Sequence, residues 1–438
     1  MGLGGSSAGC GQVSVRRLFR APFTLRGGDA HLGGLTRLGR RADAEPAPGK
    51  SAEPRSRGDA RPSRCSIRLR STAGGLPHRP EFPREGSNLL AAYVSGHGFG
   101  HATRLSEVLR ILRSRAPSIE IEVSGEAPEE LFQEAARGPT TFRRLRCDVG
   151  LAQRDALEID LAATAARCRE FEAGFAERVA SEAAHLRLRG ARLVVGDIPP
   201  LAFAAAARAG VPSVALGNFS WDWIYRHLSA SEPSLARSAD LAAQAYAGAD
   251  LILELPFAGD LSAFRTRVPV GLVARRPRLA REEARLRLGL GSETAVLVSF
   301  GGVGLPSLTP EVLARNAGLR FLLPADLSRE RLLALGLSYP DVIGAADAVV
   351  TKPGYGIVSD AIGAGARLVY SDRGDFPEYP VLVREMPAYL ACVHVPREEL
   401  LAGRLSGPVR EVLSLAAPGP TDLGGAERAA ARLLEALG

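Results

Sequence analysis

The sequence contains 438 residues, of which 46% are hydrophobic and 24% are charged, so it is long and apolar enough to bury the cores of two or three domains. A wholly disordered chain is therefore excluded. The formal net charge of +7 and the isoelectric point of about 9.4 would suggest a nucleic acid or an anionic membrane as a partner. However, residues 1–86 hold 16 Lys and Arg against 7 Asp and Glu, and the rest of the chain is slightly acidic. We therefore expect no nucleic-acid partner.

Residues 1–86 differ in composition from the rest of the chain. They are rich in Gly, Ser, Pro and Arg, and they show neither a sustained helical or strand period nor the apolar segment of a secretory signal. We predict that they form a disordered basic leader. A targeting arm and an over-extended start site are the alternatives.

Cysteine usage and hydropathy bear on the compartment. The five cysteines are scattered and form no CxxC pair, which argues against a disulfide framework and against a zinc site. No run of 18 uncharged apolar residues is present, so we expect no transmembrane segment. We expect a cytoplasmic protein that touches a membrane at most peripherally, and the oligomeric state stays open.

From Leu89 onward, short apolar runs alternate with helical patterns, which is typical of βαβ units and a parallel sheet. The first helix is indicated by Leu105, Val108, Leu109 and Leu112 on one face. Strands are expected at residues 89–95, 119–123, 193–196, 213–216 and 251–254, and further helices at 128–136, 161–188 and 200–209.

A second series of the same kind follows a proline-rich stretch at residues 255–291. Its strands are expected at residues 295–300, 320–323, 348–351, 368–371 and 391–395, and its helices at 357–365 and 425–437. We therefore predict an α/β protein with two doubly wound, Rossmann-like domains, residues 87–270 and 271–438, that face a central cleft. Packing of the last helix back on the first domain stays open.

The first candidate site is the segment of residues 95–101, Ser-Gly-His-Gly-Phe-Gly-His, between the first strand and the first helix. Gly98 and Gly100 allow a ligand to approach the backbone, and exposed N–H groups at a helix start attract anions. His101 or His97 could act as a neutral base near pH 7, and a structural hydrogen bond is the alternative for each. A dinucleotide site is less favoured because the glycine spacing is imperfect, and zinc is less favoured because no third ligand is placed.

Two further segments end at the same predicted edge of the first sheet. Asp197 could orient a histidine base or cap the helix that follows it. The stretch from Asn218 to Tyr225 holds both tryptophans of the chain, and Trp221 and Asp222 could wall an acceptor or sugar pocket. A plug of the hydrophobic core is the alternative.

The second candidate site lies in the second series. Gly301 and Gly302 close a strand and suit a diphosphate, as does Gly354 before the next helix. Lys352 is one of only two lysines among 55 basic residues, and it stands where a cation would offset phosphate charge. Asp360, in the helix that follows, could bind a ribose diol. The alternatives are an ordinary glycine turn for Gly301 and Gly302, a surface lysine for Lys352 and a solvated acid for Asp360.

Three motifs of the chain together carry a resemblance to a known family. The motifs are Tyr-Val-Ser-Gly-His-Gly-Phe-Gly-His-Ala-Thr-Arg at 93–104, Asn-Phe-Ser-Trp-Asp-Trp-Ile-Tyr at 218–225 and Lys-Pro-Gly-Tyr-Gly at 352–356. They look like the N-terminal, glycosyltransferase-like domain of plant L-arabinokinases and its stand-alone bacterial relatives, and more distantly the GT-B nucleotide-sugar glycosyltransferases. The order of the motifs is kept across roughly residues 89–415.

The resemblance implies an acceptor site in the first domain and a donor site in the second. It implies that His101 is the histidine after the glycines of the first loop, that Asp360 contacts the donor ribose in place of the usual Glu, and that Lys352 replaces an Arg or another polar residue. Glu378 falls where Gln or Asp/Gln pairs contact the transferred sugar, so the sugar specificity is expected to differ. No sugar-kinase domain follows, so we expect no kinase activity.

The expected function is therefore an inverting, metal-independent transfer of a sugar from a nucleoside diphosphate sugar, with a UDP-sugar as the expected substrate, to an unidentified acceptor. No cofactor or metal is expected. The alternatives are a non-catalytic nucleotide-sugar-binding or regulatory module, and a nucleotide-sugar epimerase or hydrolase on the same fold.

Overall fold

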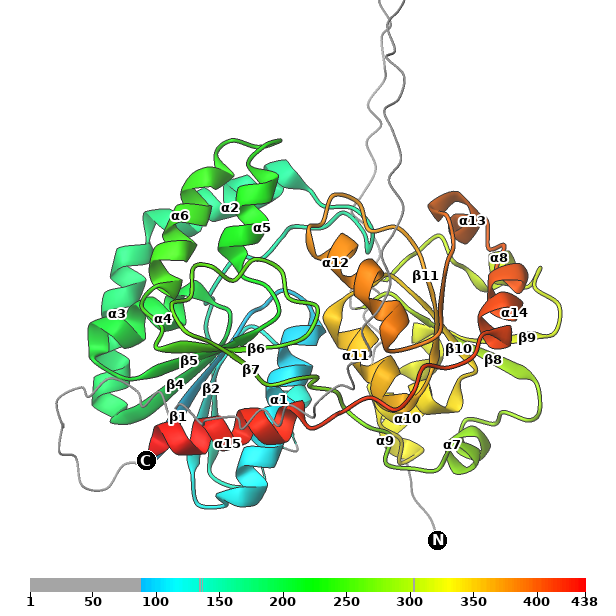
Figure 1. Cartoon of the computed structure of the whole chain (residues 1–438), viewed down its shortest axis with the longest axis horizontal. Coiled ribbons are helices and arrows are strands. Elements are labelled where there is room, and N and C mark those ends of the chain that lie inside the picture. The colour runs from blue at the N-terminus through cyan, green and yellow to red at the C-terminus, as the bar shows by residue number, and fades with distance from the viewer. Residues whose placement is uncertain (1–87, 134, 136, 302–303) are drawn as a thin grey trace, which may run out of the picture. The chain divides into compact units, whose positions relative to one another are not determined.

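The computed structural model describes residues 88–438 except 134, 136 and 302–303. The predicted leader, residues 1–86, lies outside the described residues. The described chain contains two parallel sheets, which Figure 1 shows side by side, each flanked by helices. We call the part around the seven-stranded sheet the first lobe and the part around the five-stranded sheet the second lobe. This arrangement confirms the predicted α/β architecture.

The first lobe has the strand order β3-β2-β1-β4-β5-β6-β7, and all neighbours are parallel. The central strand β1 is buried along its whole length, as expected for a continuous apolar run between two helical layers. The strands are β1 (Leu89–Val94), β2 (Glu120–Gly125), β3 (Thr140–Arg144), β4 (Ala191–Asp197), β5 (Ser213–Gly217), β6 (Leu251–Glu254) and β7 (Arg267–Pro269).

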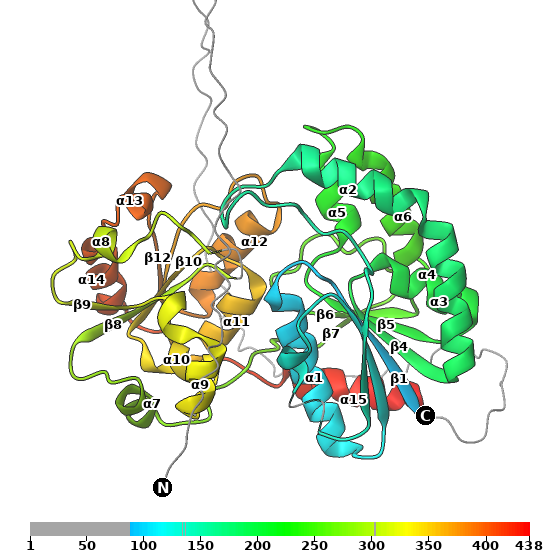
Figure 2. The ribbon, with the colours of Figure 1, turned by 180° about the vertical axis from the view of Figure 1, so that it is seen from behind.

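Helices cover both faces of this sheet, and Figure 2 shows them from behind. Leu90, Ala92 and Val94 of β1 pack toward α1 and α15, whereas Ala91 and Tyr93 pack toward the helices of the opposite face. The helices are α1 (Phe99–Arg115), α2 (Leu161–Ala173), α3 (Phe175–Arg189), α4 (Pro200–Ala209), α5 (Trp221–Leu228) and α6 (Leu235–Tyr246). The C-terminal helix α15 (Gly425–Leu437) returns from the second lobe and packs against α1 of the first (Figure 1).

The second lobe has the strand order β12-β11-β10-β8-β9, again all parallel. Its strands are β8 (Thr294–Ser299), β9 (Leu319–Leu322), β10 (Ala348–Thr351), β11 (Arg367–Tyr370) and β12 (Cys392–His394). Its helices are α7 (Arg281–Arg287), α8 (Pro310–Leu313), α9 (Arg329–Ala334), α10 (Tyr339–Ala345), α11 (Tyr355–Ala364), α12 (Glu378–Glu385), α13 (Arg397–Leu401) and α14 (Ser406–Ser414).

Some predicted elements differ in the structure. Within the range 128–136, where a helix was expected, the structure has a 3₁₀ turn at Glu129–Phe132. The long helix expected at 161–188 is interrupted at Gly174, a poor helix former, and becomes α2 and α3. The aromatic stretch from Trp221 forms the helix α5 rather than a loop.

Strand order determines where a ligand can bind. In an open parallel sheet the crevice lies at the carboxyl ends of two neighbouring strands whose connections run in opposite directions. That point lies between β1 and β4 in the first lobe and between β8 and β10 in the second. Asp197 is the last residue of β4, and the loops that follow β1, β8 and β10 hold His97, Gly301 and Lys352.

No helix of the described residues combines the length and the apolar character needed to cross a bilayer.

Candidate functional site

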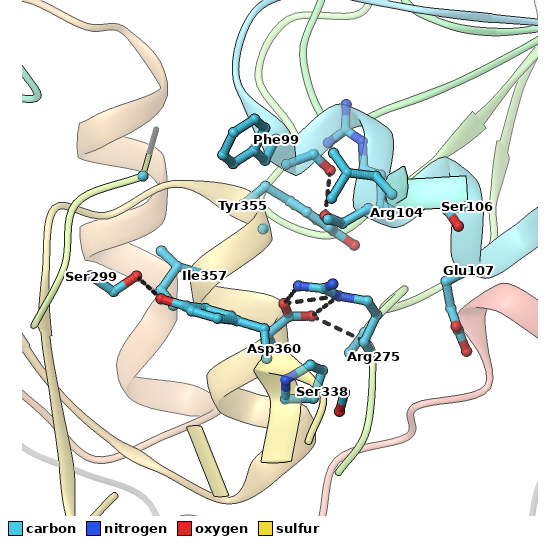
Figure 3. Close-up of a pocket in the computed structure, with 18 of the residues that line it drawn as sticks. Phe99, Arg104, Ser106, Glu107, Arg275, Ser299, Ser338, Tyr355, Ile357 and Asp360 are labelled. Carbon is cyan, nitrogen blue, oxygen red and sulfur yellow. Dashed lines mark hydrogen bonds and ion pairs between the residues drawn. The ribbon is translucent and has the colours of Figure 1, made fainter. Parts of the chain in front are cut away.

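A cavity of about 1670 Å³ is lined by residues of both lobes. The loop after β1 and the first turns of α1 line it from the first lobe, and the loops after β8 and β10 with α11 line it from the second. Figure 3 shows Phe99 and Arg104 of α1 opposite Tyr355 and Asp360 of α11. The predicted site residues that line this cavity are His97, Gly98, Gly100, His101, Gly301, Lys352, Gly354, Asp360 and Glu378.

The glycine-rich loop after β1 is anchored from beneath. Gly98 has a φ of 76°, a conformation that glycine adopts without strain. Asp148 is buried and accepts hydrogen bonds from the Gly96 N–H at 3.4 Å and from the Trp221 Nε1–H at 2.9 Å. Burial raises the pKa of Asp148, and these hydrogen bonds partly oppose the rise. The loop therefore has a defined position above the sheet.

His97 serves this loop as a hydrogen-bond acceptor. Its Nδ1 accepts the backbone N–H of Leu151 at 3.2 Å, so the ring is neutral with its hydrogen on Nε2. Burial lowers the pKa of His97 well below its ordinary value, with smaller contributions from His101 and Arg373. This geometry matches the alternative in which His97 makes a structural hydrogen bond and is not a base.

His101 and Asp197 are brought together. The His101 Nδ1 lies 2.7 Å from the Asp197 Oδ1, and the Asp197 side chain is fully buried at the end of β4. His101 lies in the first turn of α1 and lines the cavity. A histidine held by a carboxylate on one nitrogen and facing a cavity has the geometry of a general base.

Arg104 is a residue of this site to which the sequence analysis assigned no role, although it closes the first quoted motif. Its Nε and one terminal nitrogen lie 2.6 Å from the two oxygens of Asp197, and the other terminal nitrogen donates to the Asn218 Oδ1 at 2.7 Å. The helical spacing of three residues from His101 was the one signal that could have pointed to it.

Some of the residues predicted for an acceptor pocket line the cavity, and the others are buried away from it. Gly98 and Gly100 line the cavity, and so does Phe219. Asn218 and Trp221 are fully buried behind it, and Asp222 is also buried and does not line it. Trp221 therefore has the position of the core plug considered as the alternative.

The second lobe contributes cations and a helix start. Lys352 lines the cavity, and among the residues that the structure describes its amine has no hydrogen bond or ion pair. Burial and the nearby Arg373 lower the pKa of Lys352 to about 7. Gly301 lines the cavity with a φ of 73°, and Gly302 lies outside the described residues. Gly354 precedes α11, whose first turn faces the cavity.

Asp360 is not free in the structure. Its Oδ1 accepts a hydrogen bond from the backbone N–H of Arg275 at 3.1 Å, and its Oδ2 accepts one from the side-chain Nε–H of Arg275 at 3.1 Å (Figure 3). Arg275 lies in the segment that joins the lobes, between β7 and α7. A ribose diol at Asp360 would therefore meet the guanidinium of Arg275 as well as the carboxylate.

Glu378 bridges the two lobes. One of its carboxylate oxygens accepts the Asn218 Nδ2–H at 2.9 Å from the first lobe, and the other accepts from Arg373 at 3.0 Å within the second. The Arg373 guanidinium lies 3.7 Å from the ring centroid of Phe376. Glu378 therefore reaches the cavity as part of a buried network and not as an isolated acid.

No group of three or more His, Cys, Asp or Glu side chains within the described residues could hold a metal ion. The positive charges available to an anionic ligand in the described cavity include those of side chains and of the starts of α1 and α11.

Comparison with known proteins adds two kinds of likeness. No family model matches the chain. The L-arabinokinase of Arabidopsis thaliana is 33% identical over 336 residues, which make up 75% of this chain and 32% of that protein. The chain thus spans about a third of the length of this curated relative.

Solved structures share the fold. A UGT of Phytolacca americana, complexed with UDP-2-fluoro-glucose and pterostilbene, matches 80% of this chain and 94% of its own at a TM-score of 0.51 and 15% identity. A UGT of Medicago truncatula complexed with UDP-glucose matches 80% of this chain and 99% of its own at a TM-score of 0.50 and 12% identity. At these identities the likeness concerns the fold alone.

Proposed function

We propose that this chain, which shares the fold of the two UGT structures, transfers a sugar from a nucleoside diphosphate sugar, such as a UDP-sugar, to the hydroxyl group of an acceptor. The donor binds at the loops of the second lobe, and the acceptor lies near the loop after β1. The observation that carries this proposal is the His101–Asp197 pair, which faces the cavity shared by both lobes.

His101 acts as the general base in this proposal. With Nδ1 hydrogen-bonded to Asp197, its Nε2 takes the proton of the acceptor hydroxyl. The acceptor oxygen forms a bond to the anomeric carbon of the donor, and the bond from that carbon to the diphosphate oxygen breaks with its electron pair on the diphosphate. Attack from the face opposite the leaving group inverts the configuration at the anomeric carbon.

The departing diphosphate needs positive charge nearby. Lys352, Arg373 and the N–H groups of the first turn of α11 are the groups available at this part of the cavity. An anion next to Lys352 favours its protonated form, so a bound diphosphate creates the cation that stabilises it. The proposed reaction therefore needs no metal ion.

Two measurements test the proposal. A thermal-shift screen of nucleoside diphosphates and their sugars should identify a ligand that, at 100 times its dissociation constant, stabilises the protein by about 2.7 kcal/mol. The His101→Ala variant should then bind this donor as the wild type does but transfer sugar about 10²–10⁴-fold more slowly.

The matched control for this experiment is His185→Ala. His185 pairs with Glu122 and does not line the cavity, so its loss should leave the rate unchanged. Full turnover by His101→Ala would rule out the base, and donor binding without transfer to any acceptor would contradict the proposed activity.

A further inference from the structure

Arg104 is a buried cation at the centre of the site, with only 3% of its surface exposed. Its three guanidinium nitrogens are all engaged, two by Asp197 and one by Asn218. Its charge lies 5.0 Å from the ring centroid of Tyr355, so it packs against the second lobe, as Figure 3 shows. A guanidinium with this many partners is held in one orientation.

Asp197, which Arg104 holds in place, determines which nitrogen of His101 carries the hydrogen. A guanidinium nitrogen is only a donor, and one of them lies 3.1 Å from the His101 Nδ1. The carboxylate oxygen of Asp197 is only an acceptor and lies closer to the same atom, at 2.7 Å. The hydrogen on Nδ1 therefore points to Asp197, and Nε2 keeps its lone pair for a substrate proton.

Arg104 also changes the charge that His101 experiences. Burial alone would raise the pKa of Asp197, but the guanidinium of Arg104 and then His101 hold it below its ordinary value. The carboxylate is thus ionised, and its charge is balanced by a permanent cation. Without that cation, the unbalanced carboxylate would favour the protonated form of His101, which cannot act as a base.

We propose that Arg104 is a positioning residue that pairs with Asp197 and so keeps His101 in the neutral form that accepts a proton. The role of that proton rests on the proposed function, whereas the ionisation of His101 can be measured without any substrate. The titratable and charged groups that face this pair are Arg104, His97, Asp148 and, across the lobes, Tyr355.

Asn218 holds Arg104 from the other side. Its Oδ1 accepts from Arg104, and its Nδ2 donates to Glu378 of the second lobe. The positioning residue is therefore fixed by contacts with both lobes, and its orientation depends on their being joined.

The test is an NMR titration of the histidine rings of the full-length protein, with the His101 signal assigned by its loss in His101→Ala. Replacing Arg104 with Met should raise the pH at which His101 takes up its proton by about one to three units, because one charge within about 4 Å of the ring is removed. Arg104→Gln should give the same shift and carries the test if the Met variant does not fold. Arg104→Lys, which keeps the charge, should restore most of the wild-type behaviour.

Arg113→Met is the matched control. Arg113 is also buried on α1, but it bonds to backbone carbonyls and to Thr140 and, among the described residues, forms no hydrogen bond or ion pair with His101 or Asp197. It should lower stability and leave the His101 titration unchanged. An unchanged or lowered titration point in both Arg104→Met and Arg104→Gln would overturn the inference.

Transfer assays separate this inference from the proposed function. In Arg104→Met the acidic limb of the kcat profile should move upward with the titration point, while the KM for the donor changes less than about twofold. A uniform loss of kcat at every pH, with the acidic limb of the profile at its wild-type pH, would indicate a merely structural role. If the wild type transfers no sugar but the titration point moves as expected, the proposed function fails and the role of Arg104 stands.

Discussion

At the scale of single residues, three buried carboxylates around the cavity are each paired with an arginine. The pairs are Asp197 with Arg104, Asp360 with Arg275 and Glu378 with Arg373. Removing one member of such a buried pair typically costs about 3–5 kcal/mol, because the other charge is left uncompensated. Lys352 also lines the cavity and has no such carboxylate partner within the described residues.

The unpaired Lys352 should make stability depend on pH. Its pKa is about 7 in the folded protein and 10.5 for the free side chain, so between these values the unfolded chain holds a proton that the folded chain lacks. Folding is therefore penalised fully below pH 7, and the penalty is lost as the pH rises toward 10.5. We expect Lys352→Met to raise the melting temperature of the ligand-free protein most below pH 7 and least near pH 10, as measured by calorimetry across this range.

The same variant should bind the nucleotide less well, by about 10- to 100-fold in dissociation constant, because a charge-assisted contact is lost. Isothermal titration with the nucleoside diphosphate from the screen measures this. A variant that is destabilised below pH 7, or that binds as tightly as the wild type, would show that Lys352 is not an unpaired donor-site cation.

At the scale of elements, the starts of α1 and α11 meet at two glycines. A Cβ built on Gly356 would lie 2.9 Å from the Gly100 Cα, whereas one built on Gly100 would lie 3.5 Å from the Gly356 nitrogen. The two helix starts can approach this closely only because side chains are absent there. The two glycine-containing motifs thus make one contact between the lobes.

Gly356→Ala should therefore destabilise the protein by about 1–3 kcal/mol in urea unfolding, since the added methyl group overpacks against backbone atoms. Gly407→Ala is the matched control, because Gly407 is likewise the second residue of its helix but has open space around it. It should gain up to about 1 kcal/mol from the better helix propensity of Ala. Equal effects of the two substitutions would mean that the helix starts do not depend on this contact.

Local signals account for which elements the sequence analysis identified. The apolar face of α1 and the apolar runs of β1 and β10 are continuous patterns, and all three elements were predicted. The edge strand β3 was missed because its residues are half-exposed and do not alternate. The helix α5 was missed because two tryptophans in one short stretch were interpreted as a ligand wall.

At the scale of the whole molecule, one hydrophobic cluster reaches across both lobes. It includes Leu90 and Leu109 from the first lobe and Val349 and Val358 from the second. The helix α15 adds to it and is tied down where Arg428 donates to the carbonyl of Val270 at 2.7 Å. The site is thus supported by a core that the described residues build among themselves.

Deleting residues 1–86 should therefore leave nucleotide affinity within about twofold of the full-length value, because the lining residues that the structure describes fall within 97–427. Titration calorimetry on the two proteins measures this. The deletion also removes the basic excess, so any binding to anionic surfaces should decrease at the same time. A loss of nucleotide binding would show that residues 1–86 contribute to the site.

The sequence by itself determined the α/β class, the glycine loops at strand ends and the positions of His101, Asp197 and Lys352, because these depend on patterns within a few residues. Only the tertiary structure decided which side chains pair with one another at the site. Arg104 meets Asp197 across 93 residues of sequence, Arg275 meets Asp360 across 85, and Asn218 meets Glu378 across 160. The chain has dozens of arginines and acidic residues, so the sequence does not determine which of them pair. The packing of the two sheets brings particular side chains within hydrogen-bond distance in a buried environment. There an unpaired charge costs too much free energy to remain.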